Sequence, residues 1–263
     1  MGEFEHLRTF LLVIGNARSG STLLGSILDA HANAVVANET TGSSNYWRDM
    51  DRGQILREIA DNSRRNRESG RVSEGYRYLI NPDEKEMSKL NVIGDKVWNP
   101  ATLLMHGDHA LLPRLEALLG VPIKIIHAIR NPFDVIATMH ARSQAPISDR
   151  TAWYFMHCDA ARAVRDRWDD SRYLDFHHES LFDAPAESIS ALCDFAGLAP
   201  DQRHIEACRQ MLFTQPKQTR CNLKWEAGAV RRILGKIGEY DFLTPYALED
   251  YSSLTASGDS QKQ

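Results

Sequence analysis

The chain has 263 residues, and 43% of them are hydrophobic, which is enough for a sizeable core in one large domain or two small ones. Its formal net charge of −4 gives no support for a general nucleic-acid-binding surface, although an anion site can be local. Residues 1–9 are polar and charged, and the apolar run after them is too short for a signal segment or a membrane span. We therefore expect a cytoplasmic protein with no nucleic-acid or membrane partner.

Cysteine usage points away from a metal site or a disulfide framework. The four cysteines are sparse and lack both C-x-x-C and zinc spacing, which favours reduced thiols. They are Cys158, Cys193, Cys208 and Cys221.

A strand, a glycine-bounded loop and a helix follow one another near the start of the chain. Residues 10–14 predict a buried strand, and residues 15–22 form a small polar loop. Apolar residues then recur at helical spacing, so the helix N-terminus faces whatever binds in the loop. This arrangement predicts a phosphate cradle in which Ser21 and Thr22 add hydroxyl donors. A glycine-rich turn with a solvated arginine is the alternative.

The loop departs from the nucleotide triphosphatase motif at an informative position. Gly15 and Gly20 have the spacing of G-x-x-x-x-G-K-[ST], but Ser21 stands where the lysine belongs. The cation of the loop is Arg18. An arginine offers a fixed fork of donors, which suits a bound anion better than a metal–triphosphate complex.

A second strand is predicted over residues 35–37, ending at Asn38-Glu39-Thr40. In a doubly wound sheet the carboxyl ends of the strands line the ligand crevice, so Glu39 would lie beside the anion loop. A solvated glutamate next to a capping Asn38 or Thr40 explains the same residues equally well.

Residues 41–90 combine many arginines with interspersed aromatic residues, which predicts an acceptor-binding insertion. A solvated helix face accounts for most of those charges. Residues 91–94 then predict another short strand, which would place Lys96 at a strand's carboxyl end as well.

The most strand-like run in the chain, residues 123–129, leads directly into a helix. Asn131 is a good N-cap and Pro132 a good first helical residue. Arg130 lies between the strand and the helix, where an arginine is costly unless it is paired, and this favours a functional role. Thr138, two turns into the helix, could approach the same ligand.

The remaining chain repeats the alternation of helix and strand. Together these elements predict an α/β fold with one doubly wound, mainly parallel sheet. The predicted units are a helix over 153–168, a strand over 173–176, a helix over 186–195, a domain over 1–254 and a disordered tail over 255–263.

Several of these stretches resemble the PAPS-dependent sulfotransferases, a family with a P-loop-like fold that uses 3′-phosphoadenosine 5′-phosphosulfate (PAPS). Residues 18–22, Arg-Ser-Gly-Ser-Thr, are similar to the family's loop for the 5′-phosphosulfate. Residues 130–138 are similar to its 3′-phosphate motif, and residues 177–181 and 193–198 to two later segments. The resemblance covers residues 10–240 in the order of elements.

Within that family, the motifs are most similar to those of protein-tyrosine sulfotransferases. Leu28-Asp29-Ala30-His31 and Asn38-Glu39-Thr40 resemble two of their segments, which implies that Glu39 is the general base. The resemblance assigns catalytic roles to Arg18 and Lys96 as well. It implies nucleotide contacts for Arg18, Ser19, Gly20, Ser21, Thr22, Arg130, Thr138, Arg142, His178 and Lys224.

The resemblance implies transfer of a sulfuryl group from PAPS to a hydroxyl of a small molecule or peptide, leaving PAP, without a metal. The chain departs from the pattern at Ala32, Thr138 and His178 and in the shortened loop before Trp225, so peptide-tyrosine specificity is not carried over. The acceptor and the oligomeric state stay open. A small-molecule P-loop kinase and a non-catalytic nucleotide-binding protein are the alternatives.

Overall fold

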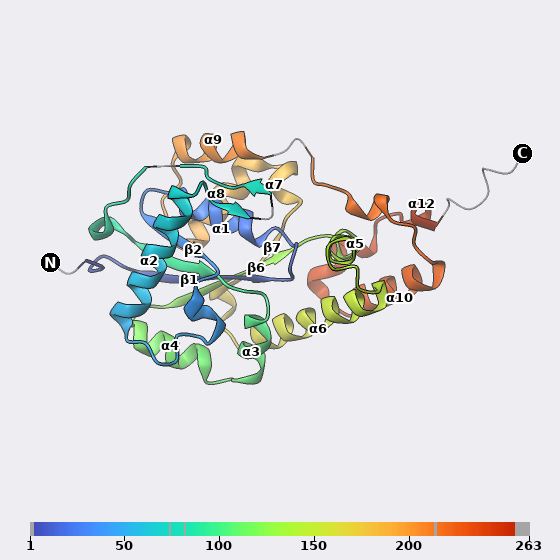
Figure 1. The fold of residues 1–263 in the computed structure, drawn as a ribbon, viewed down its shortest axis with the longest axis horizontal. Helices are drawn as coiled ribbons and strands as arrows, with labels where there is room; N and C mark the ends of the chain where they lie inside the picture. The colour runs from blue at the N-terminus through green and yellow to red at the C-terminus, as the bar shows by residue number, and fades with distance from the viewer. Residues whose placement is uncertain (1–2, 74, 82, 213–214, 256–263) are drawn as a thin grey trace, which may run out of the picture.

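The computed structural model describes residues 3–255 apart from residues 74, 82, 213 and 214. Five strands form one parallel sheet in the order β2-β5-β1-β6-β7 (Figure 1). The strands are β1 (Thr9–Gly15), β2 (Ala34–Asn38), β5 (Val92–Lys96), β6 (Ile123–Ile129) and β7 (Tyr173–His177). The predicted α/β fold with a doubly wound parallel sheet is therefore confirmed.

The connections diverge between β1 and β6. Helix α1 (Ser21–Asp29) carries the chain from β1 to the edge strand β2, and α2 (Arg52–Glu68) carries it back to β5. The next connection crosses β1 and continues to β6 and β7 on the other side. In open α/β sheets, ligands bind at such a switch point, outside the carboxyl ends of the strands.

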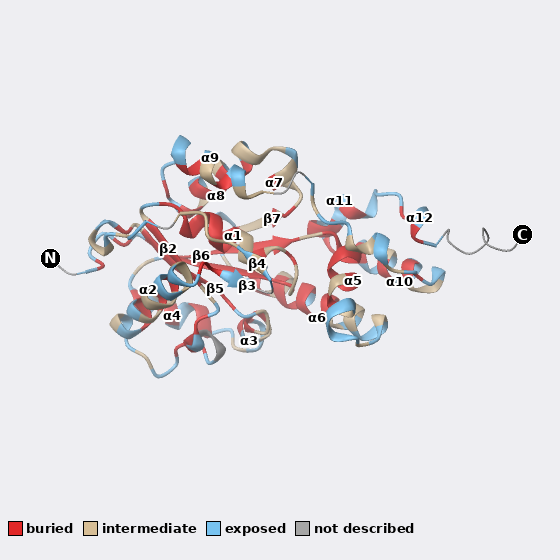
Figure 2. Ribbon diagram, turned by 45° about the horizontal axis from the view of Figure 1, so that its top comes forward, coloured by how far each residue is buried: buried red, intermediate tan, exposed pale blue. Residues whose placement is uncertain are grey.

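The sheet separates two apolar cores (Figure 2). Side chains alternate along a strand, so Leu11 and Val13 pack with α1 while Phe10, Leu12 and Ile14 pack with α2. All five are at most 1% exposed, and each such side chain contributes about 1.5–3 kcal/mol. The α1 face also holds α8 (Pro185–Ala196) and α9 (Gln202–Met211); the α2 face holds α3 (Ala101–Gly107), α4 (Leu111–Leu119) and α6 (Ile147–Arg165).

A third core packs α5 (Pro132–Ser143), which begins just after β6, against the C-terminal helices (Figure 1). Its centre is Phe133, whose ring lies 5.1 Å from that of Trp225 and 4.3 Å from that of Tyr251. The C-terminal helices are α10 (Ala227–Ile237), α11 (Thr244–Ala247) and α12 (Ser252–Thr255). Of the tail predicted over residues 255–263, Thr255 ends α12 and the rest lies outside the described residues.

The segment predicted as an insertion, residues 41–90, has two parts. Helix α2 belongs to the doubly wound core, since Ile55, Leu56 and Ile59 are fully buried against the sheet. After it comes a two-stranded antiparallel hairpin, β3 (Val72–Ser73) and β4 (Tyr76–Arg77). A role of this segment in acceptor binding stays a prediction.

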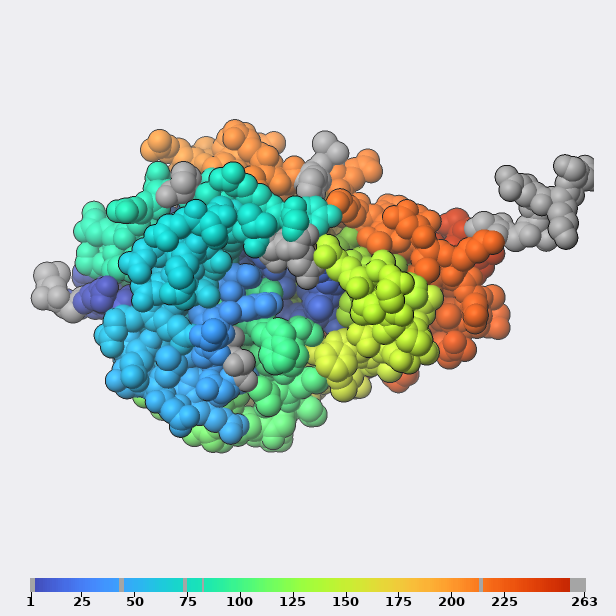
Figure 3. All heavy atoms as spheres, in the orientation of Figure 1, coloured from blue at the N-terminus to red at the C-terminus, as the bar shows by residue number. Residues whose placement is uncertain are grey.

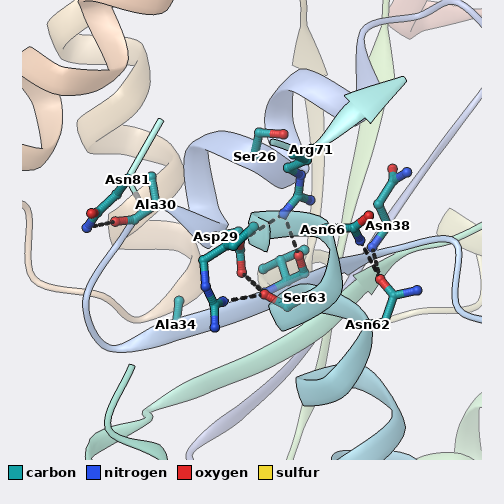
Figure 4. Close-up of polar contacts among 12 residues, drawn as sticks. Ser26, Asp29, Ala30, Ala34, Asn38, Asn62, Ser63, Asn66, Arg71 and Asn81 are labelled. Carbon is teal, nitrogen blue, oxygen red and sulfur yellow. Dashed lines mark hydrogen bonds and ion pairs between the residues drawn. The ribbon is translucent and has the colours of Figure 1, made fainter. Parts of the chain in front are cut away.

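A buried carboxylate joins α1, β2, α2 and the start of the hairpin (Figure 4). Asp29 accepts hydrogen bonds from the guanidinium of Arg71 at 2.9 Å, the hydroxyl of Ser63 at 2.8 Å and the amide of Val36 at 2.8 Å. The ammonium of Lys85 lies 3.3 Å from the same carboxylate. Burial alone would raise the pKa of Asp29, but Lys85 and Arg71, together with the hydrogen bonds from Val36 and Ser63, hold that pKa below its usual range.

All four cysteines are free thiols, and only Cys221 is exposed.

Within the described residues, no helix is both long and apolar enough to cross a membrane.

Candidate functional site

A cavity of about 370 Å³ lies at the carboxyl ends of the strands. Figure 3 shows the hollow in the face toward the viewer, between segments from the first, middle and later parts of the chain. Every strand of the sheet has a lining residue at its end or just beyond it. These residues are Arg18 after β1, Glu39 after β2, Lys96 at the end of β5, Arg130 after β6 and His178 after β7.

The loop after β1 wraps one wall of the cavity. Gly20 is the N-cap of α1 and has a φ of 92°, a left-handed conformation that glycine adopts without strain. A Cβ at this position would lie 2.3 Å from Nδ1 of His178, so the loop and β7 approach as closely as glycine allows. Ser21 and Thr22 open the helix, whose first N–H groups lack intrahelical partners and can bind an anion.

The loop after β6 meets the loop after β1. Asn131 caps α5 by accepting a hydrogen bond from the amide of Phe133 at 3.0 Å, and Pro132 is the first helical residue, as predicted. The Arg130 guanidinium donates to the main-chain carbonyl of Arg18 at 3.3 Å and to that of Lys217. Arg130 is therefore anchored at the switch point of the sheet.

Helix α5 supplies two further lining residues, Thr138 and Arg142. The hydroxyl of Thr138 donates to the carbonyl of Asp134 one turn earlier at 2.7 Å, which leaves its oxygen able to accept. Asp134 in turn accepts from the amide of Arg220 at 2.8 Å and from its guanidinium at 2.5 Å. This ion pair docks the C-terminal segment on α5 and brings Lys217 to the cavity.

Glu39 and Lys96 meet where β2 and β5 end side by side. Asn38 lies opposite Lys96 in the sheet register, and the amide of Glu39 donates to the carbonyl of Lys96 at 2.8 Å. The Lys96 ammonium also contacts the Glu39 carboxylate directly. The Lys96 side chain is 10% exposed and that of Glu39 41% exposed, so the carboxylate is the more accessible of the two.

The cavity is strongly cationic, although the whole chain has a net charge of −4. Five cations and one carboxylate, Glu39, line it. The cations are Arg18, Lys96, Arg130, Arg142 and Lys217. Burial and then the charge of Arg142 lower the pKa of Arg18, which nonetheless stays charged at neutral pH. Such a site favours a ligand with several negative charges.

His178 is a neutral wall of the same cavity. Burial, and then the neighbouring charge of Arg130, lower its pKa to about 3, so the imidazole carries no charge at neutral pH. Its ring packs edge-on against Phe182 with 5.2 Å between ring centroids. Among the described residues, Nδ1 of His178, which faces Gly20, has no hydrogen-bond partner.

Two aromatic residues line part of the cavity, Tyr76 of the hairpin and Tyr78 directly after it. The Lys217 ammonium contacts the hydroxyl of Tyr76 and lies 4.5 Å from the centre of its ring. A hydrogen bond from Lys217 lowers the pKa of Tyr76. The hairpin and the segment that carries Lys217 thus meet beside the cavity.

Most of the site residues predicted from the sequence line this one cavity. Ser19 does not, because it is buried within the loop, and Lys224 is exposed and outside the lining. The cavity also includes residues to which the sequence assigned no individual role. They are Asn16, Ala17, Leu23, Tyr76, Tyr78, Val97, Trp98, Asn99, Phe182, Lys217 and Thr219. The sequence contains one indication of Tyr76 and Tyr78, namely the aromatic residues interspersed among the arginines of residues 41–90.

Solved structures share the fold. The sulfotransferase domain from the Synechococcus PCC 7002 olefin synthase matches with a TM-score of 0.54 and 15% identity, over 95% of this chain and 98% of that one. The sulfotransferase domain from the curacin biosynthetic pathway matches with a TM-score of 0.53 and 14% identity, over 89% and 99%. Sulfotransferase STF9 from Mycobacterium avium matches with a TM-score of 0.52 and 12% identity, over 92% and 78%.

No curated protein sequence matches this chain. The family model described as the sulfotransferase family does match, over residues 11–202. That range contains four of the five strands of the sheet, all of β1 except its first two residues, and the residues at the carboxyl ends of the strands, from Arg18 to His178. The chain belongs to the sulfotransferase family.

Proposed function

We propose that this protein transfers a sulfuryl group from PAPS to a hydroxyl acceptor, leaving PAP. The observation that carries the proposal is the convergence of the loops after β1 and β6 on one cationic cavity, with the Glu39 carboxylate at its edge. Membership of the sulfotransferase family supports the same reaction class.

In this proposal the donor binds across the switch point of the sheet. The 5′-phosphosulfate lies in the loop after β1, held by Arg18, by the hydroxyls of Ser21 and Thr22 and by the first N–H groups of α1. The 3′-phosphate binds to Arg130, Thr138 and Arg142. Arginine suits both positions because its fork of donors can engage two phosphate or sulfate oxygens at once.

The chemical step is an in-line displacement at sulfur. The acceptor oxygen forms a bond to sulfur while the bond from sulfur to the bridging phosphate oxygen breaks. The acceptor's proton passes to Glu39, and the leaving PAP carries away the electron pair of the broken bond. Such transfers depend mainly on positioning and on neutralising peripheral charge, which Arg18 and Lys96 supply in this proposal.

Ligand preference is the first test of this assignment. Calorimetry should show that PAP binds without magnesium and more tightly than ATP or ADP, because the 3′-phosphate has its own cationic subsite. A preference for ATP that depends on magnesium would favour a kinase instead.

Turnover is the second test. Labelled PAPS and a broad panel of phenols, alcohols, sugars and tyrosine peptides should yield at least one sulfated product. Tight PAP binding with no transfer to any member of the panel would favour a non-catalytic nucleotide-binding protein.

A further inference from the structure

Glu39 has a backbone conformation that its neighbours must maintain. Its φ is +55°, in the left-handed region that residues other than glycine and asparagine rarely adopt. A residue in this conformation persists where surrounding contacts determine it, and such residues cluster at active sites. The contacts on either side of Glu39 therefore decide where its carboxylate lies.

Both flanking residues are held by hydrogen bonds. On one side, Asn38 pairs with β5 and its amide donates to the side chain of Asn62 at 3.0 Å. On the other side, Thr40 donates twice to one carboxylate oxygen of Asp95, from its amide at 3.2 Å and from its hydroxyl at 2.9 Å. Thr40 is 2% exposed and Asp95 fully buried, so solvent does not compete for these bonds.

Two adjacent residues of β5, Asp95 and Lys96, contact Thr40 and Glu39 respectively. Lys96 contacts the Glu39 carboxylate, and its Cβ lies on the α1 face of the sheet, 3.1 Å from the Cβ position of Gly25. Because side chains alternate along a strand, Asp95 lies on the opposite face, where it holds Thr40. One strand thus fixes both the carboxylate and the backbone that carries it.

We propose that Thr40 and Asp95 are positioning residues that hold Glu39 at the cavity. This inference rests on the proposed function, in which Glu39 takes the acceptor's proton. Neither Thr40 nor Asp95 lines the cavity, so their effect on the reaction passes through Glu39. A displacement of about 1 Å in a reacting group is enough to lower a rate about 100-fold.

The test removes the hydroxyl and keeps the shape of the side chain. Thr40→Val should lower kcat about 10- to 100-fold while the affinity for PAP changes less than about twofold, because the donor loops are untouched. Thr40→Ser, which keeps the hydroxyl, should recover most of the rate. Thr102→Val is the matched control, since Thr102 is equally buried, does not line the cavity and has a hydroxyl without a hydrogen-bond partner among the described residues, and it should keep the wild-type kcat.

A second background separates positioning from general structural damage. In Glu39→Gln enzyme, Thr40→Val should cause no further loss of kcat, because the base through which it acts is already gone. An equal loss in both backgrounds, a loss of PAP affinity, or an unchanged kcat in Thr40→Val would each overturn the proposal.

Asp95→Asn gives an independent variant if Thr40→Val does not fold. It replaces the charged acceptor by a neutral one of the same shape, and kcat should fall with PAP affinity retained; an unchanged kcat would overturn the proposal. The proposed function fails by different results, namely no transfer from labelled PAPS to any acceptor or a magnesium-dependent preference for ATP, whereas full activity of Glu39→Gln removes only Glu39 as the base. The positioning role fails when Glu39→Gln is impaired and Thr40→Val is not.

Discussion

The guanidinium of Arg130 donates a hydrogen bond to the main-chain carbonyl of Arg18, a residue 112 positions earlier in the chain. The bond joins the loops after β1 and β6 at the point where the connections of the sheet diverge. The two arginines proposed to bind the two charged ends of the donor are therefore positioned by one another as well as by their own strands.

Arg130→Ala should weaken PAP binding about 10- to 100-fold, since a hydrogen bond to a charged group contributes about 1.5–3 kcal/mol and 1.4 kcal/mol corresponds to a factor of ten. Calorimetry at fixed ionic strength measures the change. Arg162→Ala is the control, because Arg162 donates to the carbonyl of Glu239 and does not line the cavity. Equal PAP affinity in the two variants would contradict the assignment of the 3′-phosphate subsite.

Glu39→Gln should lower kcat about 10²- to 10⁴-fold, the usual contribution of a general base, and leave PAP affinity unchanged. Steady-state kinetics with labelled PAPS and calorimetry with PAP give the two readouts. Glu116→Gln controls for loss of a carboxylate away from the cavity, where Glu116 pairs with Arg172 at 2.7 Å. A Glu39→Gln enzyme as fast as wild type would remove the proposed base.

Gly20→Ala should destabilise the fold by about 2–4 kcal/mol, combining left-handed strain of about 1–2 kcal/mol with overpacking against His178. Chemical denaturation gives the free energy of unfolding. Gly107→Ala is the matched control, because a Cβ there meets no described atom within 4 Å and φ is not positive. The expectation is wrong if the two variants unfold at the same denaturant concentration.

Asp29→Asn should lower the free energy of unfolding by about 3–5 kcal/mol, because it leaves the buried charges of Arg71 and Lys85 without their carboxylate. Asp61→Asn is the control: it breaks an exposed pair with Arg64 and should change the free energy of unfolding by at most about 1 kcal/mol.

Acid titration provides a second readout for Asp29. Its pKa is lowered in the folded protein, so its stabilisation is fully present above the unfolded pKa and is lost as pH falls through the folded pKa. The difference in stability between wild type and Asp29→Asn should therefore shrink below about pH 4. A difference that stays constant down to the acid transition would contradict this account.

His178 should make the protein less stable on mild acidification. Its folded pKa of about 3 lies below the ordinary 6.5, so between those values the unfolded chain binds a proton that the folded one does not. The free energy of unfolding then falls as pH falls, by up to about 1.4 kcal/mol per pH unit from this group. His178→Gln should reduce that slope between pH 6 and 4, whereas His6→Gln, at an exposed position, should not.

Local signals made parts of the site predictable. The run of β-branched residues in 123–129 matches β6 to the residue, and the Asn131-Pro132 pair marks the start of α5 because capping depends on neighbours in sequence. The sheet topology made another part predictable. Because parallel strands bring their carboxyl ends together, the sequence could place Arg18, Glu39 and Arg130 at one edge of the sheet.

Contacts between distant segments could not be predicted in this way. Arg71 looks like one of many solvated arginines in 41–90, but it is 2% exposed, because Asp29 at the end of α1 supplies a buried partner. The contact of Tyr76 with Lys217 likewise depends on how two segments 141 residues apart dock on the core. The local sequence pattern of neither segment predicts this contact.

The central position of β1 has a consequence for synthesis of the protein. This strand leaves the ribosome before its two partners in the sheet, residues 92–96 and 123–129. At translation rates of about 5–20 residues per second, the unpaired N–H and C=O groups along its two edges wait on the order of ten seconds for both neighbours. Nascent chains are thus open to aggregation or chaperone capture until β6 emerges, and the cavity, whose lining also includes His178 and Lys217, is among the last features of the molecule to form.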